Sequence, residues 1–369
     1  MSAADARAEA ARLMGICNAC RYCEGYCAVF PAMERRIEFG SADVSYLANL
    51  CHECGACHSA CQYAPPHEFA VNIPRTFAAV RVATYEECAW PRAFAGLFRR
   101  NPLLVATAMA LSAALFLALG AAAGGGLLMR RDGGFYAIFP HGLLVAIFAP
   151  AFGFAVLALA MGAARYRRLV RDSKGISPEG VDAVRAAGDA LTLRYLDGGG
   201  EGCFEGRGDP AKTRRVFHHF TFYGFGLCFA ATAVATLYHY VLGLSAPYAL
   251  TSLPVALGTL GGLGLVVGPA GLLWLDARRD IELVEPGQRS MQRSFIALLL
   301  LVSVTGLALL ALRDTALMGP LLAIHLGFVL AFFVTLPYGK FVHGIYRSQA
   351  LAKFAREIRA PNTAGIAEG

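Results

Sequence analysis

The chain has 369 residues, of which 56% are hydrophobic, and its mean hydropathy is +0.50. Soluble globular proteins are about 45–50% apolar, so this composition excludes an ordinary soluble enzyme and indicates an integral membrane protein with a soluble part. The net charge of +7 is also typical of proteins that bind polyanions, but no nucleic-acid-binding motif accompanies it. The polar segment 1–16 lacks the apolar core of a signal peptide.

Eight of the eleven cysteines lie in two runs near the N-terminus. Both runs have the spacing C-x2-C-x2-C-x3-C, and a proline stands four residues after each run. In two-cluster ferredoxins this spacing folds three thiolates around one cubane, and the fourth cysteine of each run binds the other cluster. We therefore expect two [4Fe–4S] clusters, each bound by one set of four cysteines. The first set is Cys17, Cys20, Cys23 and Cys61, and the second set is Cys51, Cys54, Cys57 and Cys27.

Zinc is the main alternative for these cysteines. Structural zinc sites use two C-x2-C pairs with a longer interval, whereas four cysteines within eleven residues, twice over, exceed what one tetrahedral ion needs. Disulfides are disfavoured because the stretch is expected to face the reducing cytosol. The proline that usually follows the fourth cysteine is replaced by Ala28 and Gln62, and the segment 42–50 is expected to form a helix. Both features favour a helical two-cluster domain over a compact ferredoxin.

Six apolar segments follow a soluble domain at 1–100. Each has about the length of the roughly 20 residues that cross a bilayer, and only the fifth is short. They are Pro102–Met129, His141–Met161, Val216–Leu242, Leu253–Leu275, Phe295–Leu312 and Pro320–Phe341. We expect them to form two groups of membrane helices, at 101–163 and 216–345, with an inner loop at 164–215 and an inner tail at 346–369.

The basic residues give the orientation of these segments, because Lys and Arg accumulate on the cytoplasmic side of membranes. With the cysteine domain in the cytosol, the inner segments hold 30 of the 33 Lys and Arg residues, and the outer loops hold only Arg130, Arg131 and Arg313. This asymmetry accounts for the net charge. It predicts a multi-pass protein of the cytoplasmic (inner) membrane with its cysteine domain on the cytoplasmic side.

Ionisable residues inside membrane segments are costly and are candidates for function. The third segment carries His218, His219 and His239, and the sixth carries His325 and His343. His325 and His343 are 18 residues apart, which places them on one face of a continuous helix about 27 Å apart. If the two helices are antiparallel, His239 meets His325 near the outer face, and His218, or less favourably His219, meets His343 near the inner face. Two bis-histidine sites of this kind suit two b-type haems.

The alternative is that these five histidines line a pore or lie at the membrane interface, hydrogen-bonded to carbonyls. We expect His141, at the start of the second segment, to be an interfacial residue. The glycine-rich segment 198–202 lacks the Lys-Ser/Thr end of a phosphate loop and is expected to be flexible, so the chain has no flavin or nicotinamide site of its own. Other cysteines and histidines are expected to have structural, exposed or hydrogen-bonding roles. They are Cys88, Cys203, Cys228, His52, His58 and His67.

Several strings of residues resemble the CitB/TcuB family of tricarballylate-utilisation proteins and the C-terminal half of CobZ, a flavoprotein fusion of cobalamin synthesis. The resemblance covers nearly all of the chain, and its most specific string runs from Gln62 through Tyr-Ala-Pro-Pro-His-Glu-Phe-Ala. The spacing of His325 and His343 is also similar to that in the dihaem gamma subunit of respiratory nitrate reductases. The resemblance implies a mostly α fold, in which a ferredoxin-type two-cluster domain precedes a six-helix bundle like a dihaem cytochrome b.

The same resemblance implies an electron-transfer function. A FAD-dependent, TcuA-like partner would dehydrogenate tricarballylate or a related tricarboxylate. This chain would dehydrogenate no substrate itself, but would reoxidise the partner's flavin and pass electrons through two [4Fe–4S] clusters and haem b to quinone. One alternative is a membrane-anchored iron–sulfur redox sensor without quinone turnover. Another is an enzyme that acts directly on a small substrate through the membrane histidines, as a transporter-like proton relay would.

Overall fold

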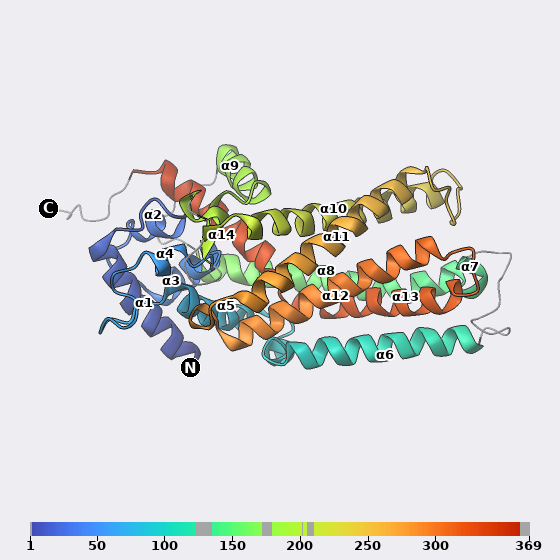
Figure 1. Cartoon of the computed structure of the whole chain (residues 1–369), viewed down its shortest axis with the longest axis horizontal. Coiled ribbons are helices and arrows are strands. Elements are labelled where there is room, and N and C mark those ends of the chain that lie inside the picture. The colour runs from blue at the N-terminus through green and yellow to red at the C-terminus, as the bar shows by residue number, and fades with distance from the viewer. Residues whose placement is uncertain (1, 123–134, 172–178, 201, 205–209, 362–369) are drawn as a thin grey trace.

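The computed structural model describes residues 2–122, 135–171, 179–200, 202–204 and 210–361. It is mostly helical and elongated, with the cysteine-bearing helices gathered at one end and the long helices extending from them (Figure 1). The N-terminal elements are α1 (Ala3–Cys20), α2 (Val29–Met33), α3 (Ser41–Leu50), α4 (Ala56–Ser59), α5 (Ile73–Cys88) and the 3-10 helix η1 (Arg92–Leu97).

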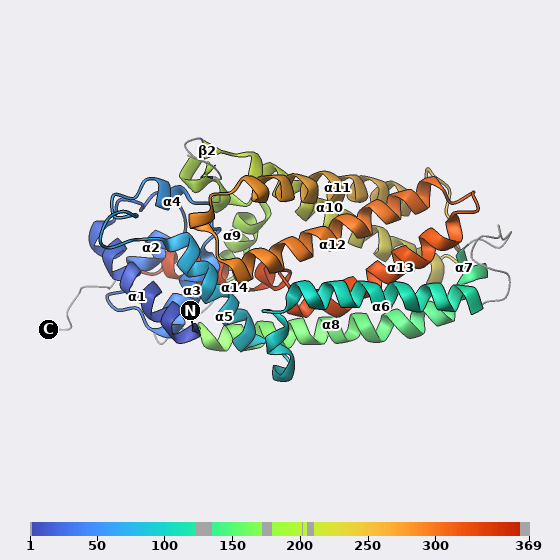
Figure 2. The same ribbon diagram turned by 60° about the horizontal axis from the view of Figure 1, so that its bottom comes forward.

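Six helices are long and apolar enough to cross a membrane, which confirms the number expected from the sequence. They are α6 (Asn101–Ala122), α8 (His141–Leu169), α10 (Thr213–Tyr240), α11 (Leu253–Arg278), α12 (Pro286–Ala311), and α13 (Met318–Thr335) with the 3-10 helix η4 (Leu336–Tyr338). Figure 2 shows them running along the long axis of the molecule. The chain is therefore a multi-pass membrane protein.

The remaining described elements are short or lie at the ends of these helices. They are α7 (Phe135–Ile138), α9 (Gly180–Leu191), the 3-10 helices η2 (Arg194–Gly200) and η3 (Ile281–Leu283), α14 (Val342–Arg359), and one antiparallel pair of strands, β1 (Cys203–Phe204) and β2 (Pro210–Ala211).

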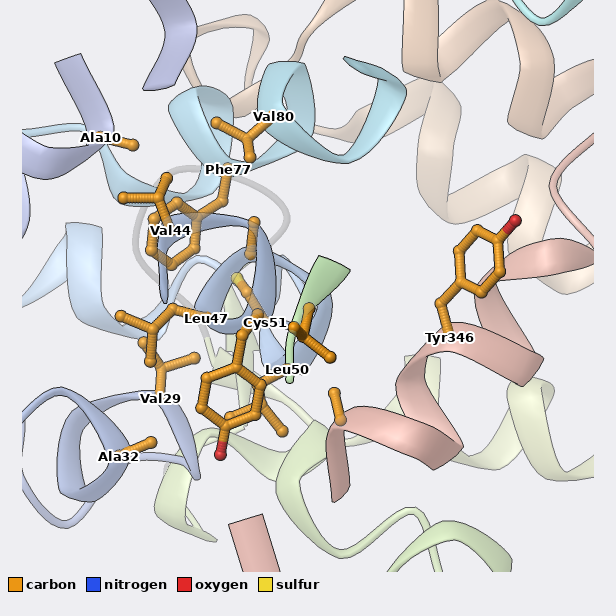
Figure 3. Packing of buried hydrophobic residues seen from close by; sticks show 14 of the residues in the cluster. Ala10, Val29, Ala32, Val44, Leu47, Leu50, Cys51, Phe77, Val80 and Tyr346 are labelled. Carbon is orange, nitrogen blue, oxygen red and sulfur yellow. The ribbon is translucent and has the colours of Figure 1, made fainter. Parts of the chain in front are cut away.

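The core of the cysteine domain is packed between α3 and α5. Val44 and Leu47 on α3 and Phe77 and Val80 on α5 are all buried, and Figure 3 shows them gathered near Cys51. Cys51 immediately follows the last residue of α3, Leu50. Burial of these apolar side chains, worth about 1.5–3 kcal/mol for each large one, therefore also fixes where the second cysteine run begins.

Helix α12 is longer than the sequence predicts. The fifth apolar segment was expected to begin at Phe295, but the helix begins at Pro286. Proline suits the first helical position, and the side chain of Glu285 accepts a hydrogen bond from the backbone N–H of Gln288 at 2.6 Å. The helix therefore starts in a polar turn that hydropathy does not detect.

The sixth apolar segment is not one continuous helix, which is a correction. Helix α13 ends at Thr335, η4 contains Pro337, and Gly339 is extended before α14 begins. Proline cannot donate the backbone hydrogen bond that a helix needs, so the chain turns at this point. His325 on α13 and His343 on α14 consequently do not lie on one face of a straight helix, as their spacing had predicted.

Most of the segment predicted as an inner tail at 346–369 belongs to a packed helix, and residues 362–369 lie outside the described part of the chain. Helix α14 contacts α3 and α9, and its Glu357 is buried. The carboxylate of Glu357 binds the Arg36 guanidinium at 2.5 Å and accepts a hydrogen bond from the Tyr46 hydroxyl at 3.0 Å. Residues from both ends of the sequence therefore build the same domain.

Helices α10 and α11 pack closely through glycines. A Cβ atom at Gly261 would lie 2.8 Å from both the backbone nitrogen of Cys228 and the carbonyl oxygen of Gly224. Small residues allow such close approach between membrane helices, where apolar burial alone does not drive association. Helix α10 is thus packed mainly along α11, and this arrangement affects the histidines described below.

Candidate functional site

The structure gathers the eight cysteines of the two runs around two neighbouring cavities. The four cysteines of the first set line a cavity of about 300 Å³, and the four of the second set line a smaller one of about 20 Å³. Cys57 lines both cavities, so the two sets adjoin. Each cavity is thus lined by three cysteines of one run and the fourth of the other, and the larger cavity is lined by Cys57 as well. This is the grouping that the spacing predicts, and ligation itself stays a prediction.

Electrostatics within each set reflect the same grouping. Burial, followed by the neighbouring Cys23, Cys61 and Cys20, raises the pKa of the Cys17 thiol to about 12. Burial, followed by Cys54 and Cys51, raises the pKa of the Cys27 thiol well above its usual value. Metal ligands must be thiolates, so thiols with raised pKa values hold their protons until a metal displaces them. The charge of a bound cluster would lower these pKa values again.

The donor sets fit two cubanes in number and kind. Among the described residues, no three Cys, His, Asp or Glu side chains are close enough together to hold a single metal ion. The smaller cavity has room for about one water molecule, so binding a cubane there requires the second set of sulfurs to move apart. The larger cavity already provides space beside the first set.

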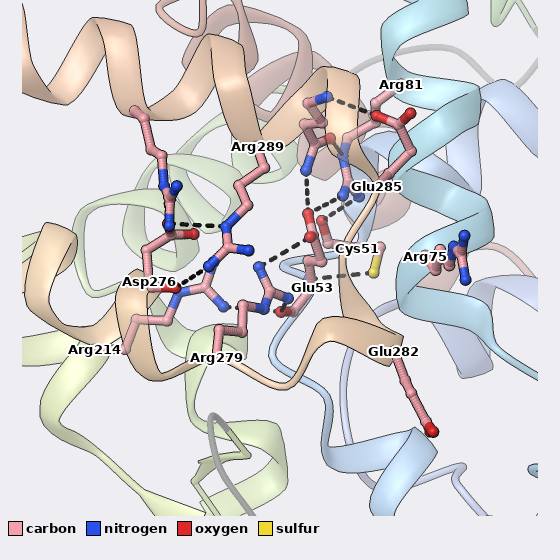
Figure 4. A network of polar contacts seen from close by, with 12 residues as sticks. Cys51, Glu53, Arg75, Arg81, Arg214, Asp276, Arg279, Glu282, Glu285 and Arg289 are labelled. Atoms are coloured by element: carbon pink, nitrogen blue, oxygen red, sulfur yellow. Dashed lines mark hydrogen bonds and ion pairs between the residues drawn. The ribbon is translucent and has the colours of Figure 1, made fainter.

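The loop of the second run is held by a buried carboxylate. Glu53 has a φ of +57° and a side chain only 6% exposed. Its carboxylate binds the guanidinium of Arg81 at 2.5 Å and that of Arg279 at 2.9 Å, and it also accepts a hydrogen bond from the Gln288 side chain (Figure 4). Burial alone would raise the pKa of Glu53, but Arg279, Arg81 and other cations lower it to about 2.

Backbone carbonyls of the same loop accept hydrogen bonds from four guanidinium groups. The carbonyl of Glu53 accepts from Arg214 at 2.8 Å and from Arg279 at 2.7 Å. The carbonyl of Cys51 accepts from Arg81 at 3.2 Å and from Arg347 at 2.5 Å. These arginines come from α10, from the connection after α11, from α5 and from α14, so four separate parts of the chain position one cysteine loop.

The glycine-rich segment that was expected to be flexible packs against the cysteine runs. A Cβ at Gly198 would lie 2.8 Å from the Ala56 side chain, and one at Gly199 would lie 2.8 Å from the carbonyl oxygen of Gly25. The backbone N–H of Phe204 donates to the carbonyl of Cys54 at 2.8 Å. The positive φ values of both glycines allow this close approach, so the segment covers the cysteine runs.

The remaining cysteines have structural surroundings. Cys203 is buried and its thiol donates to the carbonyl of Leu196 at 3.0 Å. Cys88 is also buried, and Cys228 is half-buried beside the glycines of α11.

Of the three histidines beside the second run, His52 is the most deeply placed. It is 8% exposed, and its Nδ1 lies 2.9 Å from a guanidinium nitrogen of Arg347. Burial, followed by Arg347, His218 and other cations and histidines, lowers the pKa of His52 well below its usual value. Arg347 also donates to the carbonyl of Cys51, so His52 and the second cysteine run share this guanidinium. His58 is half-buried, and the Nδ1 of His67 accepts from the backbone N–H of Phe69 at 3.1 Å.

The inner pair of membrane-end histidines is brought together. The ring centroids of His218 and His343 are 6.2 Å apart, which leaves room for one metal ion bound at about 2 Å from a nitrogen of each ring. The Nδ1 of His343 lies 2.5 Å from the carbonyl oxygen of Lys340, the kind of contact that usually orients a metal-binding imidazole. His219 instead lies beside Tyr223, with ring centroids 5.8 Å apart.

The outer pair is not brought together. His239 stacks on His141 with ring centroids 4.1 Å apart, and His325 lies 3.1 Å from the hydroxyl of Thr305 on α12. No ring contact joins His239 to His325 in the described part of the chain. The prediction required α10 to pack along α13, whereas α10 packs mainly along α11. His141 is correspondingly a partner of His239 rather than an isolated interfacial residue.

Comparison with known proteins covers both parts of this arrangement. Residues 10–87 match the family described as the Fer4-like domain of citrate utilization protein B, and residues 97–364 match the family described as citrate utilization protein B. The chain belongs to the citrate utilization protein B family. It is 54% identical to citrate utilization protein B of Escherichia coli over 362 residues, which cover 98% of this chain and 95% of that protein. No solved structure matches.

The Fer4-like match supports iron–sulfur chemistry for this citrate utilization protein B family member. The sequence pattern identified the cysteines but missed the residues around them. Glu53 stands between two expected ligands, and its position inside the motif was the signal that could have revealed its role. Arg214, Arg279 and Arg347 were counted only as markers of the inner side of the membrane. In the structure they are bound to the second cysteine run or its neighbours.

Proposed function

We propose that this chain is a membrane-bound electron-transfer protein that reoxidises the reduced flavin of a partner dehydrogenase and reduces quinone. One observation carries the proposal: two four-cysteine sets adjoin at one end of the membrane helices, and the His218–His343 pair is linked to the second set through Arg214 and Arg347. Each arginine stands four residues from one of these histidines on the same helix, and each donates to a backbone carbonyl of the second run. Bound [4Fe–4S] clusters and haem b would supply one-electron chemistry. The chain's own residues hold these groups and position them between partner and membrane.

The chain would pass electrons from the reduced flavin of the partner to quinone, and the number of electrons given up equals the number taken up. Reduced flavin of the partner loses two electrons, one at a time, and one quinone takes up two electrons and two protons to become quinol. The partner is a TcuA-like, FAD-dependent dehydrogenase of tricarballylate or a related tricarboxylate. Citrate, in the name of the Escherichia coli relative, is a tricarboxylate. The cysteine domain lies on the cytoplasmic side of the inner membrane, where the basic residues favour it.

The proposed haem lies at the inner histidine pair. His218 and His343 would hold it, and His219 would not, because the ring of His219 lies beside Tyr223 instead. Imidazole is an axial ligand that haem iron takes in many proteins. The contacts of His239 and His325 favour no second haem between them, so this proposal is narrower than the dihaem arrangement expected from the sequence.

The first test is the cofactor content of the purified, detergent-solubilised protein. We expect about eight iron atoms and eight sulfides per chain in cubanes, and a pyridine haemochrome assay should give about one haem b. His218→Ala and His343→Ala should each lose the haem band of the reduced-minus-oxidised spectrum. His219→Ala, which changes the adjacent residue on the same helix, should retain it.

The functional test adds the reduced partner and a water-soluble quinone. Quinone reduction should require this chain, and should fall in the two variants that lose haem. A protein with two cubanes but no haem would overturn the haem assignment. If such a protein also failed to stimulate quinone reduction, a membrane-anchored iron–sulfur redox sensor would replace the electron-transfer proposal.

A further inference from the structure

The two cysteine sets differ in their electrostatic surroundings, and this difference indicates the direction in which electrons would move between them. Resting on the proposed function, we infer that the first set receives electrons from the partner and the second set passes them on to the membrane. We also infer that Arg81, Arg214, Arg279 and Arg347 hold the second cluster at the higher reduction potential. These arginines are positioning and tuning residues, since none of them is a ligand.

Positive charge surrounds the second set. Four guanidinium groups donate to the carbonyls of Cys51 and Glu53, whereas the loop itself contributes one carboxylate. A cluster becomes more negative by one charge when it is reduced, so nearby cations stabilise the reduced form. Net charge is among the factors that set cluster potentials. The buried arginines therefore raise the potential of the cluster at the second set.

Hydrogen bonds to the cysteine sulfurs act in the same direction. The backbone N–H of Glu53 donates to Cys51 Sγ at 3.3 Å. Donors to the sulfurs spread their negative charge, and this also favours the reduced cluster.

The first set has a different environment. In the first run, the guanidinium that donates to a backbone carbonyl is that of Arg21, which bonds to Asn18 at 3.1 Å on the surface. The charged residues inside the first run, Arg21 and Glu24, are opposite in sign and both exposed to solvent, which screens them. The first cluster therefore lacks the excess of buried positive charge that the second one has.

The locations of the two cysteine sets agree with the order of reduction potentials inferred for their clusters. The first set lines the larger cavity together with Tyr22, whose side chain is 68% exposed, so a soluble partner can approach this end. In the second set, Cys51 is followed directly by His52, whose Nδ1 lies 2.9 Å from a guanidinium nitrogen of Arg347, and Arg347 stands one helical turn after His343 on α14. Electrons entering at the first set move toward the higher potential and the membrane at the same time.

The test is a redox titration of the full-length protein, monitored by electron paramagnetic resonance. We expect two clusters with separate midpoint potentials. Arg347→Gln should lower only the higher midpoint, because a unit charge at roughly 10 Å in an effective dielectric of about 20 changes the reduction equilibrium about tenfold. For one electron, a tenfold change corresponds to about 59 mV. Arg347→Lys keeps the charge and should shift the midpoint much less.

Two further variants complete the design. Arg21→Gln makes the same substitution beside the first set and should change neither midpoint, since Arg21 is exposed. Cys17→Ser should alter the lower-potential signal and so identify it with the first set. If Arg347→Gln does not fold, Arg214→Gln must give the same downward shift, because Arg214 donates to the carbonyl of Glu53.

The outcomes separate this inference from the proposed function. A chain without two cubanes contradicts the proposed function. A chain with two cubanes in which the arginine variants lower the first-set midpoint, lower both midpoints equally, or change neither contradicts the direction inferred here. The expected pattern, in which only the higher midpoint falls and the lysine variant restores it, supports the inference without any activity measurement.

Discussion

Replacing Glu53 by glutamine should destabilise the cysteine domain far more than the loss of a surface ion pair does. The carboxylate binds Arg81 and Arg279, and its pKa is lowered from 4.5 to about 2. At neutral pH that lowering corresponds to about 3 kcal/mol of stability. Glu53→Gln leaves the two buried guanidinium groups without their carboxylate, a change that typically costs about 3–5 kcal/mol.

The measurement is the temperature at which a thiol-reactive dye gains access to the cysteines of the protein in detergent. A loss of about 3 kcal/mol should lower this temperature by on the order of 10 °C. Glu9→Gln is the matched control, because Glu9 pairs with Arg12 at 2.7 Å on the surface, where such pairs contribute about 1 kcal/mol or less. Equal melting of the two variants would refute the argument that Glu53 stabilises the loop.

The sign of the pH dependence is a second check on Glu53. Its pKa is lower in the folded protein, so its stabilisation is fully present above about pH 4.5 and is lost as the pH falls toward 2. The difference in stability between wild type and Glu53→Gln should therefore be constant between pH 6 and 8. A difference that changes across this range would show that another group carries the effect.

Three further predictions concern packing and topology. Gly261→Ala should lower stability by about 1–3 kcal/mol, because its Cβ would lie 2.8 Å from the backbone of α10, whereas Gly226→Ala has open space and should be tolerated. Gly199→Ala should make the clusters more sensitive to oxygen by displacing the segment that covers them, and Gly200→Ala, with a positive φ but no close neighbour, separates backbone strain from this clash. A reporter enzyme that works only outside the cytoplasm should be active when fused after Arg313, because this residue lies in a predicted outer loop. An inactive fusion would contradict the orientation proposed from the basic residues.

Periodicity and spacing were sufficient for features that depend on local sequence. The six membrane helices follow from apolar length, and the two cysteine runs follow from a repeated pattern. The predicted helix boundaries were wrong where a polar capping residue extends a helix beyond its apolar part, or where a proline ends it. Helix α12 begins at Pro286 because Glu285 caps it, and the sixth segment breaks at Pro337 although its hydropathy continues.

The histidine pairs show why helix pairing could not be predicted from spacing. The predicted contact between His239 and His325 assumed that α10 lies along α13. The spacing of histidines in the sequence does not show which helices are neighbours. The glycines of α10 and α11, among them Gly224 and Gly261, decide the neighbour of α10 instead. The inner pair does not depend on that assumption, because His343 lies on α14, beyond the break, with its ring centroid 6.2 Å from that of His218 near the start of α10.

The second cysteine run is therefore part of the membrane bundle rather than a tethered domain. Arginines from α5, α10 and α14, and from the connection after α11, donate to two adjacent carbonyls of one loop. Because each of these segments also packs in the bundle or at its end, moving the loop would break several buried contacts at once. In the proposed function, electron transfer over a fixed distance would need this rigidity, and the same arginines would supply the positive charge that we infer to raise the potential of the second cluster. Position and potential of the second cluster are thus coupled, so a variant that loosens the loop should change both together.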